Sequence, residues 1–582
     1  MTSERSVRKF WRDPCLHILL LVLALVGFKL FALEMVSRAY MDCQWCLSTK
    51  AVTHESELVL ILLAIHLLSC ISRLRLVRVP LRLLLLLGLV ITGLDLLVTH
   101  TLWTRLTLSE LLVFAGEFGA VAGFLQQLLP NIWTALAIAL AAGLVLVVFV
   151  RYLRDDRASL PPLFLYLLIG AGVVGCELVE TREYHDAFLQ NSVQVFFKRQ
   201  TSTTPYSAEF SKTISAAPAA EPAICSKAVH GRSDVILLVF ESLSMYHSAL
   251  FSGINDWMPE FDAISKTGTR FSNFYANGVT SEQGLVSLLT GEPPIARGKT
   301  TKTLFEQFHS PVDSVPRMLH GLGYETVFLT TGNLGFMDKG KWLKGIGFDV
   351  VEGHEAPAYM GLKRYQFDAA PDDALYDRAL TWLQEHKTAP VFMTLETVTT
   401  HMPNVDPETG ARSQEQTYRY ADRQLGNFVR SLRSSGFFDN GTLIITADHR
   451  AMVPLSLKEQ ALYGDRAYAR VPMTVVGKGV VARHETASLS QSDLLPSLRN
   501  ALGTGQQCAG ANQGVFLPTV AHVPQCIYTN RSYDHNSVFV HCGASDFTVA
   551  LNGDKTRFVD AIAPPPGLLP ELHRLRLGQG FR

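Results

Sequence analysis

Acidic and imidazole side chains directly follow two apolar runs in the second half of this 582-residue chain. Glu241 follows the run VILLVF, and Asp448 with His449 follows LIITA. Two carboxylates and one imidazole are a ligand set that suits Zn²⁺ or Mn²⁺. A hydroxyl residue, Thr280, stands in the segment NGVTSEQG just before a helical pattern, where a cation would help its oxygen to lose its proton. The set predicts phosphoryl transfer through a covalent intermediate at a metal site.

Other polar residues near these motifs are candidates for supporting roles. His401, in the segment VTTHMP after a further apolar run, could donate to a phosphate oxygen or protonate a leaving group. Arg450 could contact a phosphate, and an ordinary surface position is an equally good interpretation of it. Ser281 is the nearest alternative to Thr280 as nucleophile. A lone threonine before a helix is more often an N-cap, so the order and surroundings of the whole set carry the prediction.

The elements that must position these residues follow from the apolar periodicity. Buried strands are predicted at 234–240, 324–330, 390–397, 442–447 and 473–477, and helices at 259–268, 314–323, 372–386 and 414–432. This alternation predicts a mostly parallel sheet with helices on both faces and a ligand site at the carboxyl ends of its strands. From about residue 535 the pattern changes to short antiparallel strands, with a hairpin turn at Asn552-Gly553 and a closing helix at LLPELHRLR.

The first third of the chain carries stretches that are long and apolar enough to cross a membrane. Five spans are predicted, at 15–34, 57–72, 80–100, 131–151 and 160–180. Segment 108–130 is weaker, since it carries Glu117, Gln126 and Gln127, and it is predicted to be interfacial or re-entrant. Arginines and lysines at the N-terminus, after the second span and before the last predict that these ends are cytoplasmic. Everything after residue 181 is then expected outside the cytoplasm.

Three domain-sized parts follow from these patterns. They are a transmembrane domain at 1–180, a juxtamembrane helix and linker at 181–233, and a catalytic domain at 234–582. The formal net charge is zero, so no electrostatic case exists for nucleic acid as a partner. Four cysteines lie after residue 181, and they suit one or two disulfides in an oxidising compartment. Cys508 with Cys526 is the preferred pair, and free buried thiols are the alternative.

The order of the motifs resembles the lipoteichoic acid synthase and phosphoglycerol transferase branch of the sulfatase/alkaline phosphatase superfamily. The segments MPEFDAISKTGTRFSNFYANG, TYRYADRQLGNFVRSL and SQSDLLPSLRNALG are also similar to stretches of that family. The resemblance covers most of 234–505. It implies an N-terminal α-helical transmembrane bundle followed by an α/β alkaline-phosphatase/sulfatase-like domain, which has a mostly parallel sheet, helices on both faces and a small antiparallel C-terminal part.

The resemblance also implies roles for individual residues. It makes four residues the ligands of one divalent metal ion (Mn²⁺, Zn²⁺ or Mg²⁺): Glu241, Thr280, Asp448 and His449. Thr280 becomes the nucleophile and His401 a substrate-binding residue. The family has a substrate-contacting Trp and Arg after the middle strand, where this chain reads TTGNLGFMDKGKWLKGIGFD. Lys339 and Trp342 are the candidate substrate contacts there, together with Arg450.

The function implied is that of a multi-pass enzyme of the bacterial inner membrane with a periplasmic catalytic domain. It would move a phospholipid head group, preferably the glycerol phosphate of phosphatidylglycerol, to an envelope glycan or lipid acceptor. Alternatives are a phosphoethanolamine transferase that uses phosphatidylethanolamine and acts on lipopolysaccharide or a glycan, a phosphodiesterase, and a membrane scaffold with an inactive domain. A sulfatase is disfavoured, because TSEQG lacks the proline and arginine of the C/S-x-P-x-R motif.

Overall fold

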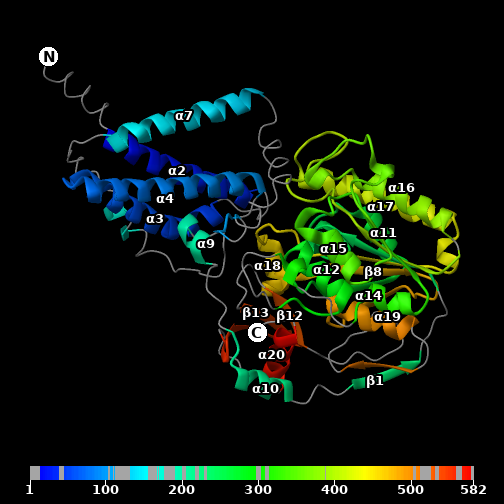
Figure 1. Ribbon diagram of the computed structural model, residues 1–582. Helices are drawn as coiled ribbons and strands as arrows, with labels where there is room; N and C mark the ends of the chain where they lie inside the picture. Colours follow the sequence, from blue (N-terminus) through cyan, green and yellow to red (C-terminus); the bar gives the residue numbers. More distant parts are fainter. Residues whose placement is uncertain are drawn as a thin grey trace. The chain divides into compact units, whose positions relative to one another are not determined.

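Figure 1 shows a computed structural model of the chain. The structure describes residues 14–38, 45–102, 105–108, 111, 132–154, 167, 170–172, 174–175, 191–198, 205–216, 222–227, 233–295, 303–307, 313–386, 388–502, 506–510, 526–530, 537–558 and 567–578. They divide into two compact units: the first holds the described residues up to 198 together with Val453–Leu457, and the second holds the other described residues from 205 onward. Each unit is described by itself.

The first unit is helical. Its elements are α2 (Pro14–Val36), α3 (Cys46–Ile71), α4 (Arg75–Leu102), α7 (Ile132–Arg154) and the short α9 (Ser192–Lys198). Among the described residues, α2, α3 and α4 contain segments long and apolar enough to cross a membrane, namely Leu16–Val36, His54–Ile71 and Arg75–Thr99. These helices coincide with the first three predicted spans, and α7 with the fourth. Most of 108–130 and of 160–180 lies outside the described residues, so the five-span prediction stays a prediction.

A cluster of charges is buried between these helices. Asp95 on α4 lies 3.3 Å from Lys29 Nζ on α2, and its Oδ1 accepts a hydrogen bond of 3.1 Å from Arg105 Nε. Ser192 Oγ at the start of α9 donates to Asp95 Oδ2 at 2.8 Å. Lys29 also pairs with Glu55 on α3. Buried charges need such partners, so the cluster joins α2, α3 and α4 to α9.

The region predicted as a linker holds regular structure where it is described. A helix, α10 (Ala208–Ala216), is followed by the strand β1 (Pro222–Lys227). The strand β1 pairs antiparallel with β11 (Gln506–Gly510), and this register places Cys225 opposite Cys508. The Pro/Ala-rich composition of 215–223 therefore did not reveal a strand whose partner lies almost 300 residues further along the chain.

The second unit is built on a nine-stranded sheet. Its strands are β2 (Val235–Phe240), β3 (Thr269–Tyr275), β4 (Glu325–Thr330), β5 (Val350–Glu352), β6 (Val391–Glu396), β7 (Thr442–Ala447), β8 (Arg470–Gly477), β9 (Arg483–Glu485) and β10 (Leu489–Ser490). The order is β10-β3-β8-β7-β2-β6-β4-β5, with β9 beside β3. Pairing is parallel except where β8 meets β7 and β3. All five apolar runs form strands, which confirms the prediction of a mostly parallel sheet.

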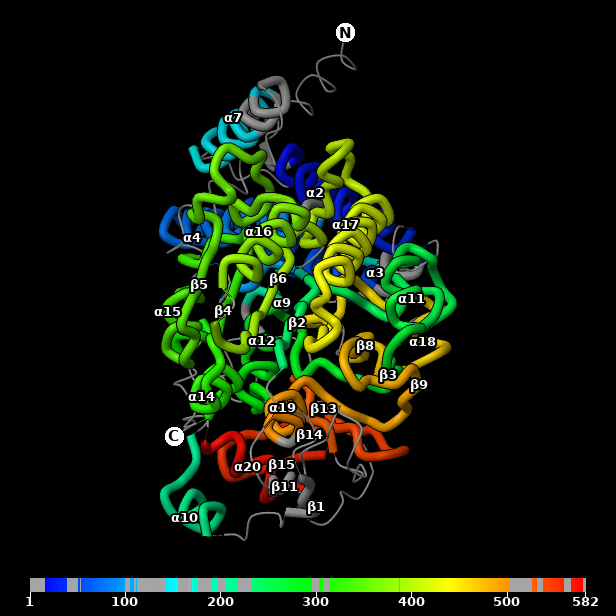
Figure 2. The backbone as a smooth tube through the Cα atoms, turned by 90° about the vertical axis from the view of Figure 1, so that its right-hand side faces the viewer, coloured from blue at the N-terminus to red at the C-terminus, as the bar shows by residue number. Residues whose placement is uncertain are grey.

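Helices cover both faces of this sheet (Figures 1 and 2). On one side lie α11 (Pro259–Lys266), α16 (Asp372–Glu385) and α17 (Gln414–Ser434), and α17 contacts both of the others. On the other lie α12 (Ser281–Thr290), α14 (Val315–Gly321) and α19 (Leu494–Leu502), which also contact one another. Strands β2, β6 and β7 are buried along their whole length, as expected for the centre of a sheet covered on both faces. Their carboxyl ends meet at one edge.

A small antiparallel sheet follows the large one, as predicted. It has the order β12 (Cys526–Asn530), β13 (Ser537–Cys542), β14 (Ser545–Asn552) and β15 (Lys555–Phe558), and α20 (Leu568–Gly578) ends the described chain. The predicted hairpin turn at Gly553 and the closing helix are both present. The preferred pairing of Cys508 with Cys526 is wrong. The antiparallel register of β12 and β13 brings Cys526 opposite Cys542, and these two form the disulfide.

Candidate active site

The carboxyl ends of two adjacent central strands bring three predicted ligands together. Glu241 follows β2, and Asp448 with His449 follows β7, which pairs in parallel with β2. One ligand atom from each of Glu241, Asp448 and His449 lies within 4.8 Å of the other two, and all three side chains are buried. Neighbouring parallel strands end at the same edge of the sheet. Their pairing therefore brings these residues together although more than 200 residues separate them in the sequence.

Backbone geometry aims each of these groups at the others. Ser242 has a φ of 58°, which turns its N–H toward Asp448, and that N–H donates to Asp448 Oδ1 at 2.8 Å. The N–H of His449 donates to the same oxygen at 2.8 Å. His449 Nδ1 donates to the carbonyl of Arg450 at 2.8 Å, which leaves Nε2 as an acceptor facing the cluster. Tyr418 Oη on α17 donates to the Ser242 carbonyl at 2.8 Å and holds this turn in place.

The donor atoms fit a divalent cation. Asp448 Oδ2 is buried, has no hydrogen-bond partner among the described residues, and lies 3.3 Å from His449 Nε2. Two acceptors that face each other at this distance repel unless a cation, or a proton on the imidazole, lies between them. Burial raises the pKa of Asp448 to about 6, and the charge of Glu241 acts in the same direction. Burial would lower the pKa of His449, but the charges on Asp448 and Glu241 outweigh it and raise that pKa.

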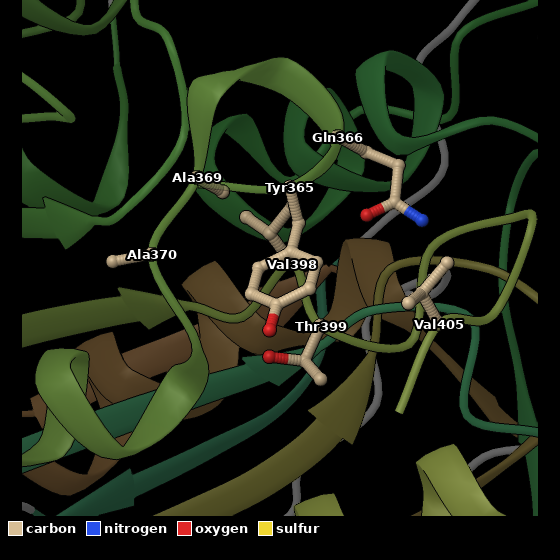
Figure 3. A pocket seen from close by; sticks show the side chains of 7 residues that line it. All are labelled: Tyr365, Gln366, Ala369, Ala370, Val398, Thr399 and Val405. Carbon is tan, nitrogen blue, oxygen red and sulfur yellow. The ribbon is translucent and has the colours of Figure 1, made fainter. Parts of the chain in front are cut away.

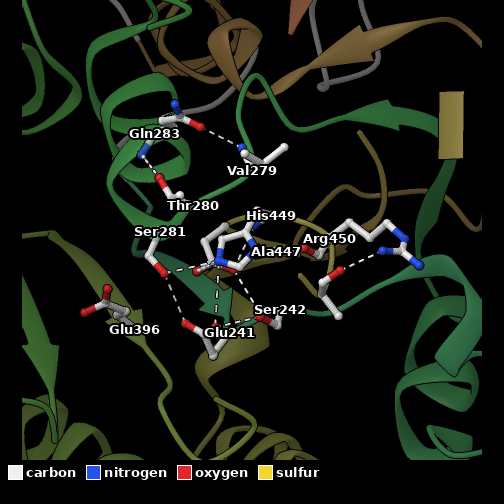
Figure 4. A network of polar contacts seen from close by, with 12 residues as sticks. Glu241, Ser242, Val279, Thr280, Ser281, Gln283, Glu396, Ala447, His449 and Arg450 are labelled. Carbon is white, nitrogen blue, oxygen red and sulfur yellow. Dashed lines mark hydrogen bonds and ion pairs between the residues drawn. The ribbon is translucent and has the colours of Figure 1, made fainter. Parts of the chain in front are cut away.

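The two hydroxyls at the start of α12 differ in what they contact (Figure 4). Ser281 Oγ lies 3.2 Å from Glu241 Oε2 and 3.3 Å from His449 Nε2. Thr280 is the N-cap of the helix, and its Oγ1 accepts a hydrogen bond of 3.4 Å from the N–H of Gln283. The structure therefore brings Ser281, rather than Thr280, into contact with the predicted ligands. The sequence could not separate these adjacent hydroxyls, because each stands at a helix N-terminus.

A glycine on α12 allows the helix to approach the site closely. A Cβ added to Gly284 would lie 2.0 Å from the backbone carbonyl oxygen of Asp448. Backbone atoms cannot move aside as the end of a flexible side chain can. The absence of a side chain at Gly284 thus sets how near the first turn of α12 comes to the strand end that carries Asp448 and His449.

Replacing Gly284 by alanine is expected to push the start of α12 away from Asp448 and lower activity by at least about 100-fold. Overpacking of this kind also costs about 1–3 kcal/mol of stability. Gly321, at the end of α14, is the matched control, because an added Cβ there has nothing within 4 Å. Gly321→Ala should leave turnover and melting temperature nearly unchanged. Wild-type activity in Gly284→Ala would contradict the close approach.

His401 and Lys339 lie near the same edge as the metal cluster. His401 follows β6, its Nδ1 donates to the carbonyl of Met402 at 2.8 Å, and its ring meets Phe367 edge-on at 4.7 Å between centroids. Burial lowers the pKa of His401, and the charges on His449 and Lys339 act in the same direction. The imidazole is thus held neutral with Nε2 as an acceptor.

The remaining two candidates are engaged elsewhere. The guanidinium of Arg450 is buried and makes a two-pronged ion pair with Glu459, at 3.0 and 2.8 Å, pointing away from Glu241 and His449 in Figure 4. A phosphate contact would require this pair to break. Trp342 is buried in the main core with its ring 4.6 Å from that of Phe305. The positions of these side chains fit packing better than substrate binding.

A small cavity is lined in part by residues that follow β6 (Figure 3). It is lined by Tyr365, Gln366, Ala369, Ala370, Val398, Thr399 and Val405. Gln366, one of these residues, donates from Nε2 to the carbonyl of His401 at 3.4 Å. The lining offers no carboxylate, imidazole or amine, so the cavity supports the loop that carries His401 rather than supplying catalytic groups.

One buried acid in this region was not singled out from the sequence. Glu396 ends β6, and its Oε2 accepts a hydrogen bond of 2.6 Å from Lys339 Nζ. An acid at the end of the apolar run VFMTL is the same signal that marked Glu241 after VILLVF. The sequence alone could therefore have identified Glu396 as a candidate site residue.

Residues 233–504 match the family model described as Sulfatase, and this range contains the sheet, the metal cluster and α12. This part of the chain is therefore a domain of the sulfatase family, and the predicted alkaline-phosphatase/sulfatase fold is confirmed.

Within that superfamily, the chain is similar to phosphoglycerol transferases and lipoteichoic acid synthases. It is 25% identical to phosphoglycerol transferase I of Xanthomonas axonopodis pv. citri, over 38% of this chain and 34% of that protein. It is 26% identical to lipoteichoic acid synthase 1 of Bacillus subtilis, over 41% of this chain and 40% of that protein. The chain thus matches well under half the length of these relatives. The solved lipoteichoic acid synthase LtaP of Listeria monocytogenes has a TM-score of 0.47 at 16% identity and covers 64% of this chain and 97% of its own.

Proposed function

We propose that this protein is a membrane-anchored, metal-dependent transferase that moves glycerol phosphate from phosphatidylglycerol to an envelope glycan or lipid acceptor. The observation that carries the proposal is the contact of the Ser281 hydroxyl with both Glu241 and His449 at the strand edge. A binding module has no use for a hydroxyl held among buried metal ligands. The phosphoglycerol transferases to which the chain is similar support glycerol phosphate as the transferred group.

The metal site is proposed to consist of Glu241, Asp448 and His449, whose donor atoms lie within 4.8 Å of one another. A divalent cation there would make a bound oxygen more acidic and offset the charge that builds up on the phosphoryl group. Mn²⁺, Zn²⁺ and Mg²⁺ all accept carboxylate ligands, and the imidazole favours the first two.

Ser281 is the proposed nucleophile, and Thr280 is the second candidate because the motif resemblance assigns it that role. The Ser281 oxygen forms a bond to phosphorus while the bond from phosphorus to the diacylglycerol oxygen breaks. Glu241 Oε2, at 3.2 Å, can accept the hydroxyl proton, and diacylglycerol leaves after taking up a proton. An acceptor hydroxyl then attacks the phosphorus, gives up its proton and restores the serine. The free N–H groups at the start of α12 favour the bound phosphate.

Lys339 is proposed to bind the phosphate through its ammonium group. His401, whose Nε2 is an acceptor, is proposed to accept a hydrogen bond from the incoming acceptor hydroxyl. The proposed catalytic domain, 234–582, faces the periplasm, and the transmembrane domain, 1–180, holds it in the bacterial inner membrane. The disulfide between Cys526 and Cys542 supports an oxidising compartment for this domain. Membrane anchoring confines the enzyme to the surface in which its lipid donor is concentrated.

The test is to incubate the full-length protein with head-group-labelled phosphatidylglycerol or phosphatidylethanolamine and follow the label. We expect label from phosphatidylglycerol to reach the protein and then an added acceptor, and a chelator to stop both steps. Label from phosphatidylethanolamine alone would replace the proposal by phosphoethanolamine transfer. Release of free glycerol phosphate, regardless of acceptor, would make the protein a phosphodiesterase. No turnover of either lipid with metal bound would contradict the proposal.

A further inference from the structure

Glu396 is a buried carboxylate at the edge of the sheet that carries the site. It ends β6, in register with Val239 of β2, two residues before Glu241. Figure 4 draws Glu396 at this edge with Glu241 and Ser281. Its side chain is only 4% exposed. The carboxylate is not part of the metal cluster, and the mechanism proposed above does not use it.

The partner of Glu396 is a residue proposed to bind substrate. Lys339 Nζ lies 2.6 Å from Glu396 Oε2, and the lysine side chain is 15% exposed. Lys339 begins α15 (Lys339–Gly345), directly after two residues with left-handed backbone, Met337 and Asp338. Such conformations persist where the surrounding structure holds them, and here they fix where the lysine leaves the chain. The pair is therefore built into the fold beside the phosphate site.

A substrate phosphate changes what this pair needs. When the ammonium of Lys339 turns to an anionic phosphate, the Glu396 carboxylate loses its counter-charge in a place almost closed to water. An unpaired buried carboxylate is costly, so a substrate that supplies a hydrogen-bond donor to Glu396 is favoured over one that does not. The group nearest the phosphate on the substrate is its own head group.

We propose that Glu396 is a specificity-determining residue that accepts a hydrogen bond from the head group of the donor lipid while Lys339 holds the phosphate. The chemistry it selects is a head group with a hydroxyl or ammonium donor close to phosphorus. This inference rests on the proposed function, and it explains why the chain carries an acid at a position where a second anion would otherwise weaken phosphate binding.

The test compares three donor lipids: phosphatidylglycerol with hydroxyl donors, phosphatidylethanolamine with an ammonium, and phosphatidylmethanol with neither. For the wild type, kcat/KM is expected to favour a donor-bearing lipid over phosphatidylmethanol by about 10-fold or more. In Glu396→Gln that preference should fall by about 10-fold, because a neutral acceptor makes a weaker hydrogen bond than a carboxylate. Whichever donor-bearing lipid loses its preference identifies the group that Glu396 recognises.

Two further measurements keep the result decisive. In Lys339→Met, kcat/KM should fall for all three lipids alike, because this lysine binds the phosphate they share. Dissociation constants of glycerol phosphate, ethanolamine phosphate and methyl phosphate with the full-length protein give the same preference without turnover, so a failure of the proposed transfer reaction is seen separately. A head-group preference that is unchanged in Glu396→Gln, with fold and metal content intact, would overturn the inference.

Discussion

Replacing Ser281 by alanine is expected to abolish the covalent adduct and lower turnover by at least about 10³-fold, because no other described hydroxyl contacts both Glu241 and His449. Thr280→Ala is the paired variant. It removes an N-cap hydrogen bond, which costs about 1 kcal/mol, and should slow the reaction only moderately. Mass spectrometry of each variant after incubation with phosphatidylglycerol locates the adduct, and thermal unfolding checks the fold.

The position of the adduct in the two variants distinguishes between the adjacent hydroxyls of Thr280 and Ser281. An adduct retained in Ser281→Ala and lost in Thr280→Ala would assign the nucleophile to Thr280, which would have to turn away from Gln283 in the working enzyme. Ser281→Thr keeps a hydroxyl at the same position and should restore part of the activity if Ser281 is the nucleophile. Adduct formation in the variant lacking both hydroxyls would remove α12 from the mechanism.

Asp448→Asn should eliminate metal binding and lower turnover by at least about 10³-fold. The amide keeps an oxygen for the N–H groups of Ser242 and His449, but places an NH₂ group where Oδ2 faces His449 Nε2. The metal-free fold should therefore persist. Added Mn²⁺ or Zn²⁺ is expected to raise the melting temperature of the wild type and not that of the variant, since a ligand stabilises only the state that binds it.

Asp546→Asn is the control for this measurement. Asp546 also pairs with a histidine, at 2.7 Å from His541 Nδ1, but it lies in the small C-terminal sheet. Its loss should leave metal content and the metal-dependent rise in melting temperature as in the wild type. Full metal occupancy in Asp448→Asn would show that the cation binds elsewhere.

The sequence predicted those strands that are apolar along their whole length. The runs that became β2, β6 and β7 are apolar throughout, and an acid directly after β2 and β7 marked the edge where a site forms. Because adjacent parallel strands end at the same edge of the sheet, the residues that follow them lie close together. The antiparallel pairing of β8 with its two neighbours had no such signal, because strand direction depends on the route of the chain between strands.

Features that depend on the rotation of a helix or on the register of two strands could not be predicted from the sequence. Thr280 and Ser281 differ by one position on the first turn of α12, and about 100° of helical rotation separates their side chains. The disulfide partner of Cys526 is set by the register of β12 with β13. The spacing of the cysteines along the chain does not reveal this register. The sequence left Arg450 as either a phosphate contact or a surface residue, and it did not reveal the buried ion pair with Glu459, nine residues later.

The charge cluster around Asp95 restricts how this part of the chain can vary over evolution. Lys29, Glu55, Asp95 and Arg105 neutralise one another out of reach of water, so losing any single member strands an opposite charge. We therefore expect tolerated substitutions to change two oppositely charged members together, or to replace all four by apolar residues. A survey of natural variants would detect these positions as mutually dependent.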